Sequence, residues 1–294
     1  MEHNFKNTRL TLGLMDDEVR SAVRPSMDAA GFEPITEVKS IASIAKAANE
    51  NSVDLLICDV NLEDGRVCGL IRKIRHHEIG GNPFIEIIVV IDAPTPKTIK
   101  EIIDSGVDDL VITPISGAQL LLRIHSLSLR KRKYVVTVDY IGPDRRKKDR
   151  PDTPGEQKIP LIDVPNILMS KALGGDEAGN LSRNIENAMK IITEQKIERG
   201  AYQIEWLAER IAASVETGEN LEDAARRMTR LSLVTEDIQK RMTDSRYDHA
   251  KEFCGKMKEL AEKIAKTLDN PDLRDARYLE KLSQSINKSI LKTK

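Results

Sequence analysis

The sequence predicts two parts of different fold class: an α/β domain built on a five-stranded parallel, doubly wound sheet, and an all-α helical bundle or coiled coil after it. Three observations support this prediction. Short apolar runs alternate with helical stretches in the first half, and glycines stand where those helices should end. In the second half, apolar residues recur at three-four spacing. The chain has 294 residues, which is long enough for two domains.

Five short runs in the first half are predicted to be strands, because most of them are rich in Val, Ile and Leu. They are Arg9–Leu14, Glu33–Val38, Asp54–Asp59, Ile85–Ile91 and Asp109–Ile112. Helical patterns occupy Val19–Ala30, Ile41–Asn49, Val67–His77, Pro96–Ser105 and Ser116–Arg132. This alternation is typical of a parallel sheet that helices cover on both faces.

The third predicted strand, VDLLICD, ends on a carboxylate, Asp59. In sheets of this kind, functional groups gather outside the edge formed by the carboxyl ends of the strands. Asp59 is therefore a candidate reactive group. The alternative interpretation is an aspartate that only caps a turn.

Residues 134–177 are predicted to be a linker between the α/β domain, residues 1–133, and the helical module, residues 178–294. The segment opens with YVVTVDYI, a candidate strand or extended arm, and continues with GPDRRKKDRPDTPGEQKIP. Dense charge and proline favour a linker over a packed element.

The second half is predicted to form antiparallel helices that pack along narrow heptad seams. One seam comprises Leu221, Ala224, Met228, Leu231, Thr235, Ile238 and Met242, and a second comprises Tyr247, Ala250, Cys254, Met257, Ala261, Ile264 and Leu268. Seams built of Ala, Met and Thr are weak cores. We therefore expect these helices to bury their seams against a second copy of the chain or against a protein partner.

Composition argues against several classes of function. Lys and Arg number 46 against 47 for Asp and Glu, so no net charge attracts nucleic acid or an anionic membrane. The basic clusters Arg130–Lys133 and Arg145–Arg150 could contact phosphates, but aspartates interrupt the second and no recognition helix follows it. No apolar run approaches the roughly 20 residues of a membrane span, and the start lacks a signal peptide's layout. Cys58, Cys68 and Cys254 have no metal-ligand spacing. We expect a cytoplasmic protein that binds neither membranes nor nucleic acid.

Several segments of the first half resemble the receiver domain of bacterial response regulators, over about residues 8–130. They are VDLLICDVN, the helix end LIRKIR, the strand IIVVI and the segment IDSGVDDLVITP. The resemblance implies a flavodoxin-like fold and makes Asp59 the candidate acceptor of a phosphoryl group from a histidine kinase. It also implies a Mg²⁺ site formed by an acidic pair, Asp16 and Asp17, by Asp59 and by the backbone carbonyl of Asn61.

The sequence departs from this family at three positions of the phosphorylation switch. Thr113 stands where the family has a lysine that contacts the phosphoryl oxygens, and Ile91 stands where it has the switch hydroxyl, with Asp92 beside it. Leu110 takes the place of a common aromatic gate residue. The interval from Asp16 to Gly31, where the first helix ends, is also shorter than in the family. Either the acidic pair is displaced, or the loop that leads into the first helix is shortened. We expect a site that keeps the nucleophile and lacks the switch.

These residues predict a two-component signal-transduction protein, an atypical, pseudo-receiver-like response regulator that acts through protein–protein interaction and is not an enzyme. The expected partners are a histidine kinase or another signalling protein, together with a homodimer formed through the helices. Mg²⁺ is the one cofactor implied. Two alternatives stay open: a phosphorylation-competent response regulator that uses Asp59, and a phosphotransfer or relay component.

Two motifs point to other signalling modules and fail in detail. The segment LGGDEA is close to the GGDEF signature of diguanylate cyclases, but Ala178 replaces the phenylalanine and heptad-patterned helices follow. His249 is the candidate phosphotransfer histidine, but Glu252 and Phe253 stand where phosphotransfer modules carry lysine and glycine. We interpret GGDE as a turn before a long helix and His249 as a polar residue beside a seam.

Two further features have no assigned chemistry. Trp206 is predicted to be either a partly buried anchor or a contact for a partner. The segment Tyr140–Arg146 resembles one that follows receiver-like domains in some proteobacterial regulators. That resemblance implies a signalling protein whose output is not DNA binding.

Overall fold

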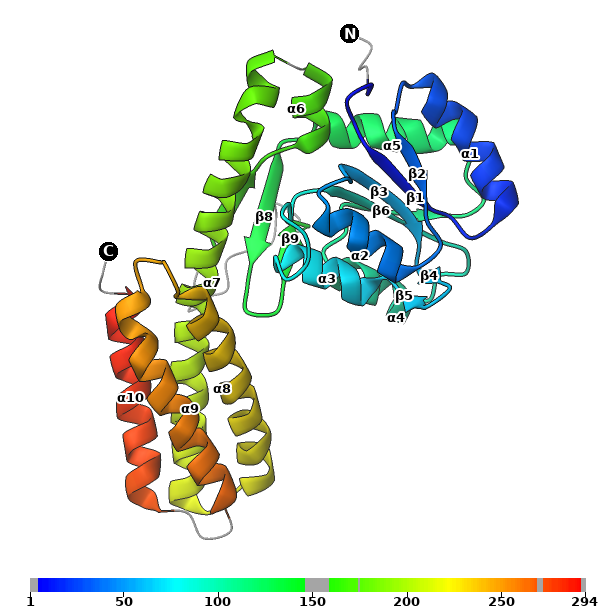
Figure 1. Ribbon diagram of the computed structural model, residues 1–294. Helices are drawn as coiled ribbons and strands as arrows, with labels where there is room; N and C mark the ends of the chain where they lie inside the picture. Colours follow the sequence, from blue (N-terminus) through cyan, green and yellow to red (C-terminus); the bar gives the residue numbers. More distant parts are fainter. Residues whose placement is uncertain (1–4, 146–158, 174, 269–271, 292–294) are drawn as a thin grey trace. The chain divides into compact units, whose positions relative to one another are not determined.

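The computed structural model describes residues 5–145, 159–173, 175–268 and 272–291 (Figure 1). The chain divides into two compact units, Met1–Met189 and Lys190–Lys294, and each is described by itself. The first unit contains a central sheet with its helices, and the second is entirely helical in its regular structure.

A parallel sheet of five strands forms the centre of the first unit, in the order β2-β1-β3-β6-β7. The strands are β1 (Leu10–Gly13), β2 (Ile35–Glu37), β3 (Leu55–Asp59), β6 (Glu86–Ile91) and β7 (Asp109–Ile112). Every neighbouring pair runs parallel. This is the flavodoxin-like strand order, which places its topological switch point between β1 and β3. The predicted fold class is confirmed.

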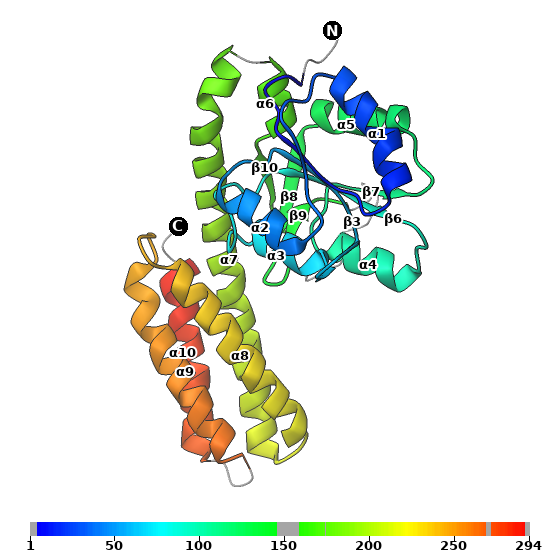
Figure 2. The ribbon, with the colours of Figure 1, turned by 45° about the vertical axis from the view of Figure 1, so that its right-hand side comes forward.

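Helices cover both faces of the sheet, because alternate residues of a strand point to opposite faces. They are α1 (Asp17–Ala29), α2 (Ile41–Asn49), α3 (Cys68–Arg75), α4 (Pro96–Asp104) and α5 (Gly117–Leu129). Leu55 and Ile57 pack in one core with α1 and α5, and Leu56 and Cys58 pack in another with α2, α3 and α4. Figures 1 and 2 show α1 and α5 side by side on their face. Burial on both faces explains why β3 is apolar up to its last residue, Asp59, and why β6 is apolar after its first residue, Glu86.

The predicted linker, residues 134–177, contains more regular structure than the candidate strand YVVTVDYI at its start. It includes most of a second, antiparallel sheet in the order β10-β8-β9, followed by a short helix, α6. These elements are β8 (Arg132–Val136), β9 (Ile141–Pro143), β10 (Leu161–Val164) and α6 (Ile167–Leu173). Asn166 joins α6 to α5: its Nδ2 donates to Leu127 O at 2.7 Å and its Oδ1 accepts from Met169 N at 2.9 Å.

A buried network of charges attaches β8 to the parallel sheet. Arg132 of β8 donates to Glu86 Oε1 at 3.0 Å and pairs with Asp108, and Arg75 of α3 donates to the other Asp108 oxygen at 2.7 Å. Tyr134 closes the network, since its hydroxyl accepts from Arg132 at 2.8 Å. Although burial opposes ionisation, the two guanidinium groups hold the pKa of Asp108 below its usual value. Burial raises the pKa of Glu86 to about 8.

The segment Tyr140–Arg146 has a structural role in its described part. The Tyr140 hydroxyl donates to Pro143 O at 3.0 Å, and Arg145 donates to Val107 O at 2.6 Å. A side chain on Gly142 would meet the Gly106 Cα at 2.9 Å. The segment therefore fastens β9 against the turn before β7, while Arg146 lies outside the described residues.

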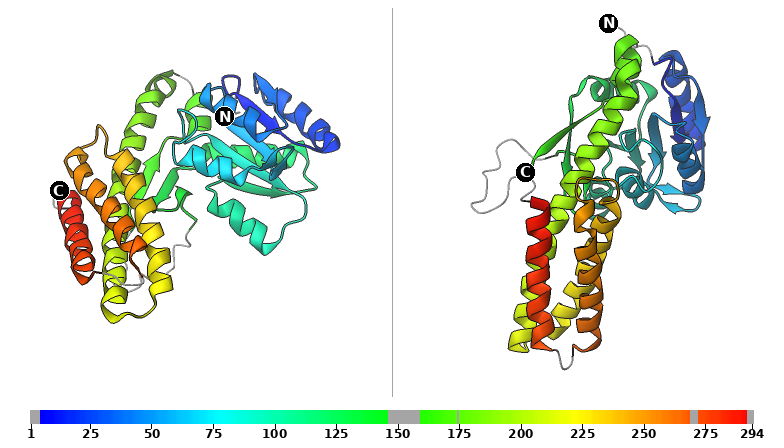
Figure 3. Two further views of the ribbon diagram at one scale, coloured as in Figure 1. Left: turned by 60° about the horizontal axis from the view of Figure 1, so that its bottom comes forward. Right: turned by 60° about the vertical axis from the view of Figure 1, so that its left-hand side comes forward.

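The second unit is a bundle made by the later part of α7 and by three further helices (Figure 3). The elements are α7 (Gly175–Thr217), α8 (Leu221–Arg241), the 3-10 turn η1 (Asp248–Ala250), α9 (Lys251–Lys266) and α10 (Leu273–Leu291). The GGDE segment was predicted to be a turn before a long helix, but Gly175, Asp176 and Glu177 already belong to α7, and Gly174 lies outside the described residues. Among the helices that the structure describes, none is long and apolar enough to span a bilayer.

Both predicted heptad seams are buried within this one chain, except that Leu221 and Leu268 at their ends are only partly buried. Met228, Leu231 and Ile238 of α8 and Met257 and Ile264 of α9 are at most 2% exposed. The seams are therefore buried by packing within the chain, because α8 packs against α9 and α9 packs against α10. A homodimer through the helices stays a prediction, and it would need outward-facing residues.

Replacing Arg132 by Ala should destabilise the first unit by about 3–5 kcal/mol, because it leaves Asp108 and Glu86 buried with one guanidinium fewer. Hydrogen exchange read by mass spectrometry should show loss of amide protection in β8 and β10. The matched control is Lys133→Ala, at a half-exposed neighbour, which should change little. Unaltered protection in the Arg132 variant would contradict the role of the network.

Leu231 and Leu233 of α8 form a matched pair, since Leu231 is fully buried and Leu233 is 58% exposed. Leu231→Ala should lower the free energy of unfolding by about 2–5 kcal/mol, and Leu233→Ala should lower it by less than about 0.5 kcal/mol. Urea unfolding followed by Trp206 fluorescence measures both. Equal losses would show that α8 buries a different face.

Candidate functional site

The carboxyl ends of the parallel strands surround a cavity of about 320 Å³. Asp59 ends β3, and Asp92 and Thr113 directly follow β6 and β7. The loop after β1 brings Asp16 to the same edge. The cavity is lined by Met15, Asp16, Val19, Asp59, Val60, Asn61, Val90, Ile91, Asp92 and Thr113. The parallel topology therefore gathers three carboxylates from three different loops.

Asp59 is held in place by the backbone of the first loop. Its Oδ2 accepts a hydrogen bond from Met15 N at 2.7 Å. Partial burial raises the pKa of Asp59, the Met15 hydrogen bond opposes this rise, and the charges of Asp16 and Asp92 add to it. The carboxylate is thus fixed, half-buried and close to two like charges.

The predicted acidic pair is divided between the cavity and the solvent. Asp16 is the N-cap of α1 and accepts from Glu18 N at 2.7 Å and Val19 N at 3.2 Å, and it lines the cavity. The Asp17 side chain is 81% exposed, pairs with Arg20 and is absent from the cavity lining. The structure therefore brings one acid of the pair to Asp59.

Asn61 lies two residues after Asp59, in a small hairpin, and it lines the cavity. The hairpin joins β4 (Asn61–Leu62) to β5 (Gly65–Arg66), and Figure 1 shows it beside the ends of the sheet. Arg66 lines an adjoining cavity with Asn61 and Asp92 but is paired with Glu101 at 2.6 Å. The described lining of the Asp59 cavity contains no basic side chain.

The three predicted switch positions lie in or directly after the last two strands of the parallel sheet. Thr113 follows β7 at the cavity, and its Oγ1 donates to Asp92 Oδ1 at 2.9 Å. Ile91, the last residue of β6, is 4% exposed and belongs to the core. Leu110 is partly buried against the same core. Asp92 is the carboxylate that the prediction did not assign a role, although its position directly after a strand at this edge is visible in the sequence.

The oxygen-rich lining suits Mg²⁺, which prefers carboxylate, carbonyl and water ligands. A divalent cation would also offset the mutual repulsion of Asp16, Asp59 and Asp92. Among the described side chains, however, no three carboxylate, histidine or cysteine groups are arranged so that they could hold a metal ion. The donors fit the ion chemically, and their present positions do not complete a ligand set.

Comparison with protein-family models finds no match, and comparison with curated proteins finds none either. Among solved structures, the receiver domain of a sensor histidine kinase from Pseudomonas aeruginosa, described with magnesium in its active-site cleft, is 18% identical with a TM-score of 0.34. The match covers 40% of this chain and 93% of that one.

Two further structures match the same N-terminal part. Chemotaxis protein CheY4 of Vibrio cholerae is 17% identical with a TM-score of 0.35, and 40% of this chain covers 98% of it. An orphan response regulator of H. pylori is 19% identical with a TM-score of 0.35, and 41% of this chain covers 96% of it. At these identities the likeness concerns the fold alone.

Asp59→Asn should raise the melting temperature at neutral pH. The raised pKa means that the native state favours the protonated carboxyl, so this contribution to stability is complete below the unfolded pKa of about 4 and is lost as pH rises through the folded pKa. Asparagine stays neutral and still accepts from Met15 N. Thermal unfolding followed by circular dichroism should show a gain at pH 7 that disappears in acid. The control Asp17→Asn should show no such gain, and an unchanged or lower melting temperature for Asp59→Asn would contradict the expectation.

Proposed function

We propose that the chain is a signal-transduction protein of the two-component type, an atypical response regulator that acts through protein–protein interaction. One observation supports the proposal: Asp59, the candidate phosphoacceptor by resemblance, ends β3 at a cavity lined by three carboxylates and by no described basic side chain. The role is not enzymatic, and its expected location is the cytoplasm.

Electrostatics argues against efficient phosphorylation of Asp59. A carboxylate that attacks a phosphoryl group needs cations that neutralise the charge developing on the transferred oxygens. Thr113 supplies none, and Asp92 adds a further negative charge. Asp16, Asp59 and the Asn61 carbonyl would be the groups that hold Mg²⁺, which would supply the missing positive charge when bound.

The readout of phosphorylation is also missing. Ile91 stands at the end of β6 without a hydroxyl and is packed into the core, so it cannot form a hydrogen bond with a phosphorylated Asp59. The only described hydroxyl lining the cavity is that of Thr113, which is engaged by Asp92. These substitutions accord with a protein that binds a histidine kinase or another signalling protein through a surface that phosphorylation does not change.

The helical unit offers outward-facing aromatic contacts for such a partner or for a second copy, since Trp206 of α7 and Tyr278 of α10 are each half-exposed. Trp206 of α7 is 50% exposed, and the Arg210 guanidinium lies over its ring at 5.5 Å. Aromatic and arginine side chains are enriched among the residues that dominate interface energy. Of the two predictions for Trp206, an anchor or a partner contact, its exposure favours the partner contact.

Two alternatives remain distinguishable. A phosphorylation-competent regulator is favoured by the half-buried position of Asp59 in the lining of the cavity. A relay through His249 is disfavoured by its place in η1, the turn before α9, where its Nε2 lies 3.3 Å from Ser289 O.

Incubation of the whole protein with Mg²⁺ and acetyl phosphate should leave its intact mass unchanged, because the cavity lacks a cation at the phosphoryl site. In the double variant Asp92→Ala, Thr113→Lys, the restored cation should produce a phosphoryl adduct that Asp59→Asn abolishes. Thr229→Lys, on the exposed side of α8, is the matched control and should remain unmodified. An Asp59-dependent adduct in the unaltered protein would establish the phosphorylation-competent alternative instead.

A further inference from the structure

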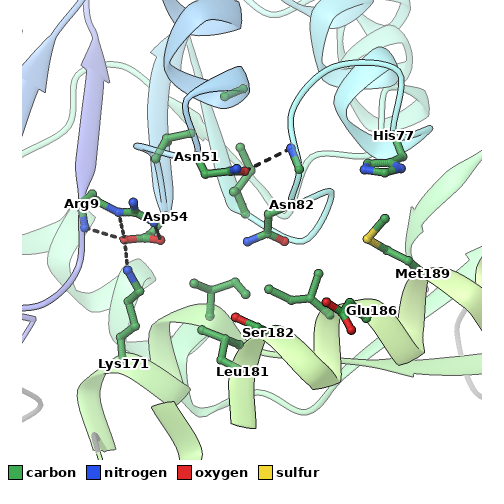
Figure 4. Close-up of a pocket in the computed structure, with 16 residues that line it drawn as sticks. Arg9, Asn51, Asp54, His77, Asn82, Lys171, Leu181, Ser182, Glu186 and Met189 are labelled. Carbon is green, nitrogen blue, oxygen red and sulfur yellow. Dashed lines mark hydrogen bonds and ion pairs between the residues drawn. The ribbon is translucent and has the colours of Figure 1, made fainter. Parts of the chain in front are cut away.

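A second cavity lies at the opposite edge of the sheet from Asp59, where the strands begin. Its volume is about 590 Å³, which is in the range of small-molecule sites. The start of β3, the turn before β6, α6 and the first part of α7 surround it, all within the first unit (Figure 4). It is lined by Arg9, Ala48, Asn51, Val53, Asp54, His77, Gly81, Asn82, Ile85, Ile167, Lys171, Leu181, Ser182, Ile185, Glu186 and Met189.

One end of this cavity carries a net positive charge. The Arg9 guanidinium donates to both oxygens of Asp54 at 2.8 and 2.9 Å, and Lys171 Nζ pairs with the same carboxylate. Burial opposes ionisation of Asp54, but these cations hold its pKa below the usual value. Two cations therefore share one buried anion, and both side chains line the cavity. This end suits the anionic group of a ligand.

The other end presents polar groups that no described residue uses. Ser182 and Glu186 project from α7 toward the cavity, and Asn82 faces them from the turn before β6 (Figure 4). The Asn82 Oδ1 accepts from Phe84 N at 2.9 Å, and its NH₂ group has no partner in the described part of the chain. A free carboxylate with a hydroxyl and an amide beside it suits an N–H or O–H donor.

Apolar side chains also line the cavity: Leu181 lies between Lys171 and Glu186, and Met189 lies beyond Glu186 (Figure 4). Leu181, Ile185 and Met189 recur at every fourth position of α7, so they share one face of the helix. Ile85 and Val53 line the cavity from the strand side. An apolar stripe on a helix normally packs against a complementary apolar surface, but here it borders a cavity.

We propose that this cavity binds a small organic molecule with an anionic group at one end, an N–H or O–H donor at the other and an apolar body between them. The anionic group lies at Arg9 and Lys171, the donor at Glu186 and Ser182, and the body against the α7 stripe. The site is independent of Asp59, and a bound molecule would connect α7 to the sheet.

Three probes with one ring and different ends test this assignment on the whole protein: 4-(aminomethyl)benzoate, 4-methylbenzoate and 4-methylbenzylamine. Affinities come from saturation-transfer NMR titrations. We expect 4-(aminomethyl)benzoate to bind tightest and 4-methylbenzylamine not to bind. Lys171→Gln should weaken both benzoates about tenfold, the loss of one charge-assisted contact. Glu186→Gln should weaken only 4-(aminomethyl)benzoate, to the level of 4-methylbenzoate.

Two tryptophan variants locate the binding without relying on the charged residues. Ser182→Trp fills the cavity from an exposed position on α7 and should abolish binding. Asn184→Trp, exposed on the same helix but outside the cavity lining, should leave binding intact. The proposal is overturned if neither benzoate binds, if both bind equally, if 4-methylbenzylamine binds best, or if Ser182→Trp binds as the unaltered protein does.

Discussion

The pairing of Arg132 and Arg75 with Asp108 is the interaction on which the first unit depends. All three side chains are buried, so each charge is tolerable only in the presence of the others. Arg75 also donates to the backbone oxygens of Pro83, Ile85 and Gly106, which hold the turns before β6 and β7 in position. Through Arg132 the same network attaches β8, and β8 in turn pairs with β9 and β10. The second sheet is therefore part of the α/β domain and not a linker.

The two edges of the parallel sheet have opposite electrostatic characters. At the carboxyl edge, strand ends and a helix cap bring Asp16, Asp59 and Asp92 together without a described cation in the cavity. At the amino edge, two cations converge on Asp54. The backbone topology imposes the first arrangement, because parallel strands end together. The second depends on α6, which carries Lys171 back to the start of β3.

Local sequence patterns predicted the sheet and the seams because their burial follows a regular period. Leu55–Cys58 is apolar because both faces are covered, and Met228, Leu231 and Ile238 repeat with the helix. A strand was a candidate over YVVTVDYI, which covers most of β8, but β10 and the pairing of the three strands were not predicted, because β8 buries Arg132, a residue type that is usually exposed. Lys171 and Asp54 are 117 positions apart, and no local pattern indicates that they meet. At the candidate site, Asp59, Ile91 and Thr113 could be placed from strand ends, whereas the outward turn of Asp17 depends on its pairing with Arg20.

The contact between Gly142 and Gly106 limits how this sequence can change over evolutionary time. A Cβ on Gly106 would lie 2.6 Å from Ile141 O, and a Cβ on Gly142 would meet Gly106 Cα at 2.9 Å. Neither position can gain a side chain while the other backbone stays in place, so the two glycines constrain each other across 36 residues of chain. A lineage that lost one would lose the attachment of β9 before it lost any chemistry. Persistence of the YIGPDR segment among related chains would then record a packing constraint, and its presence would be a marker of the second sheet and not of a catalytic activity.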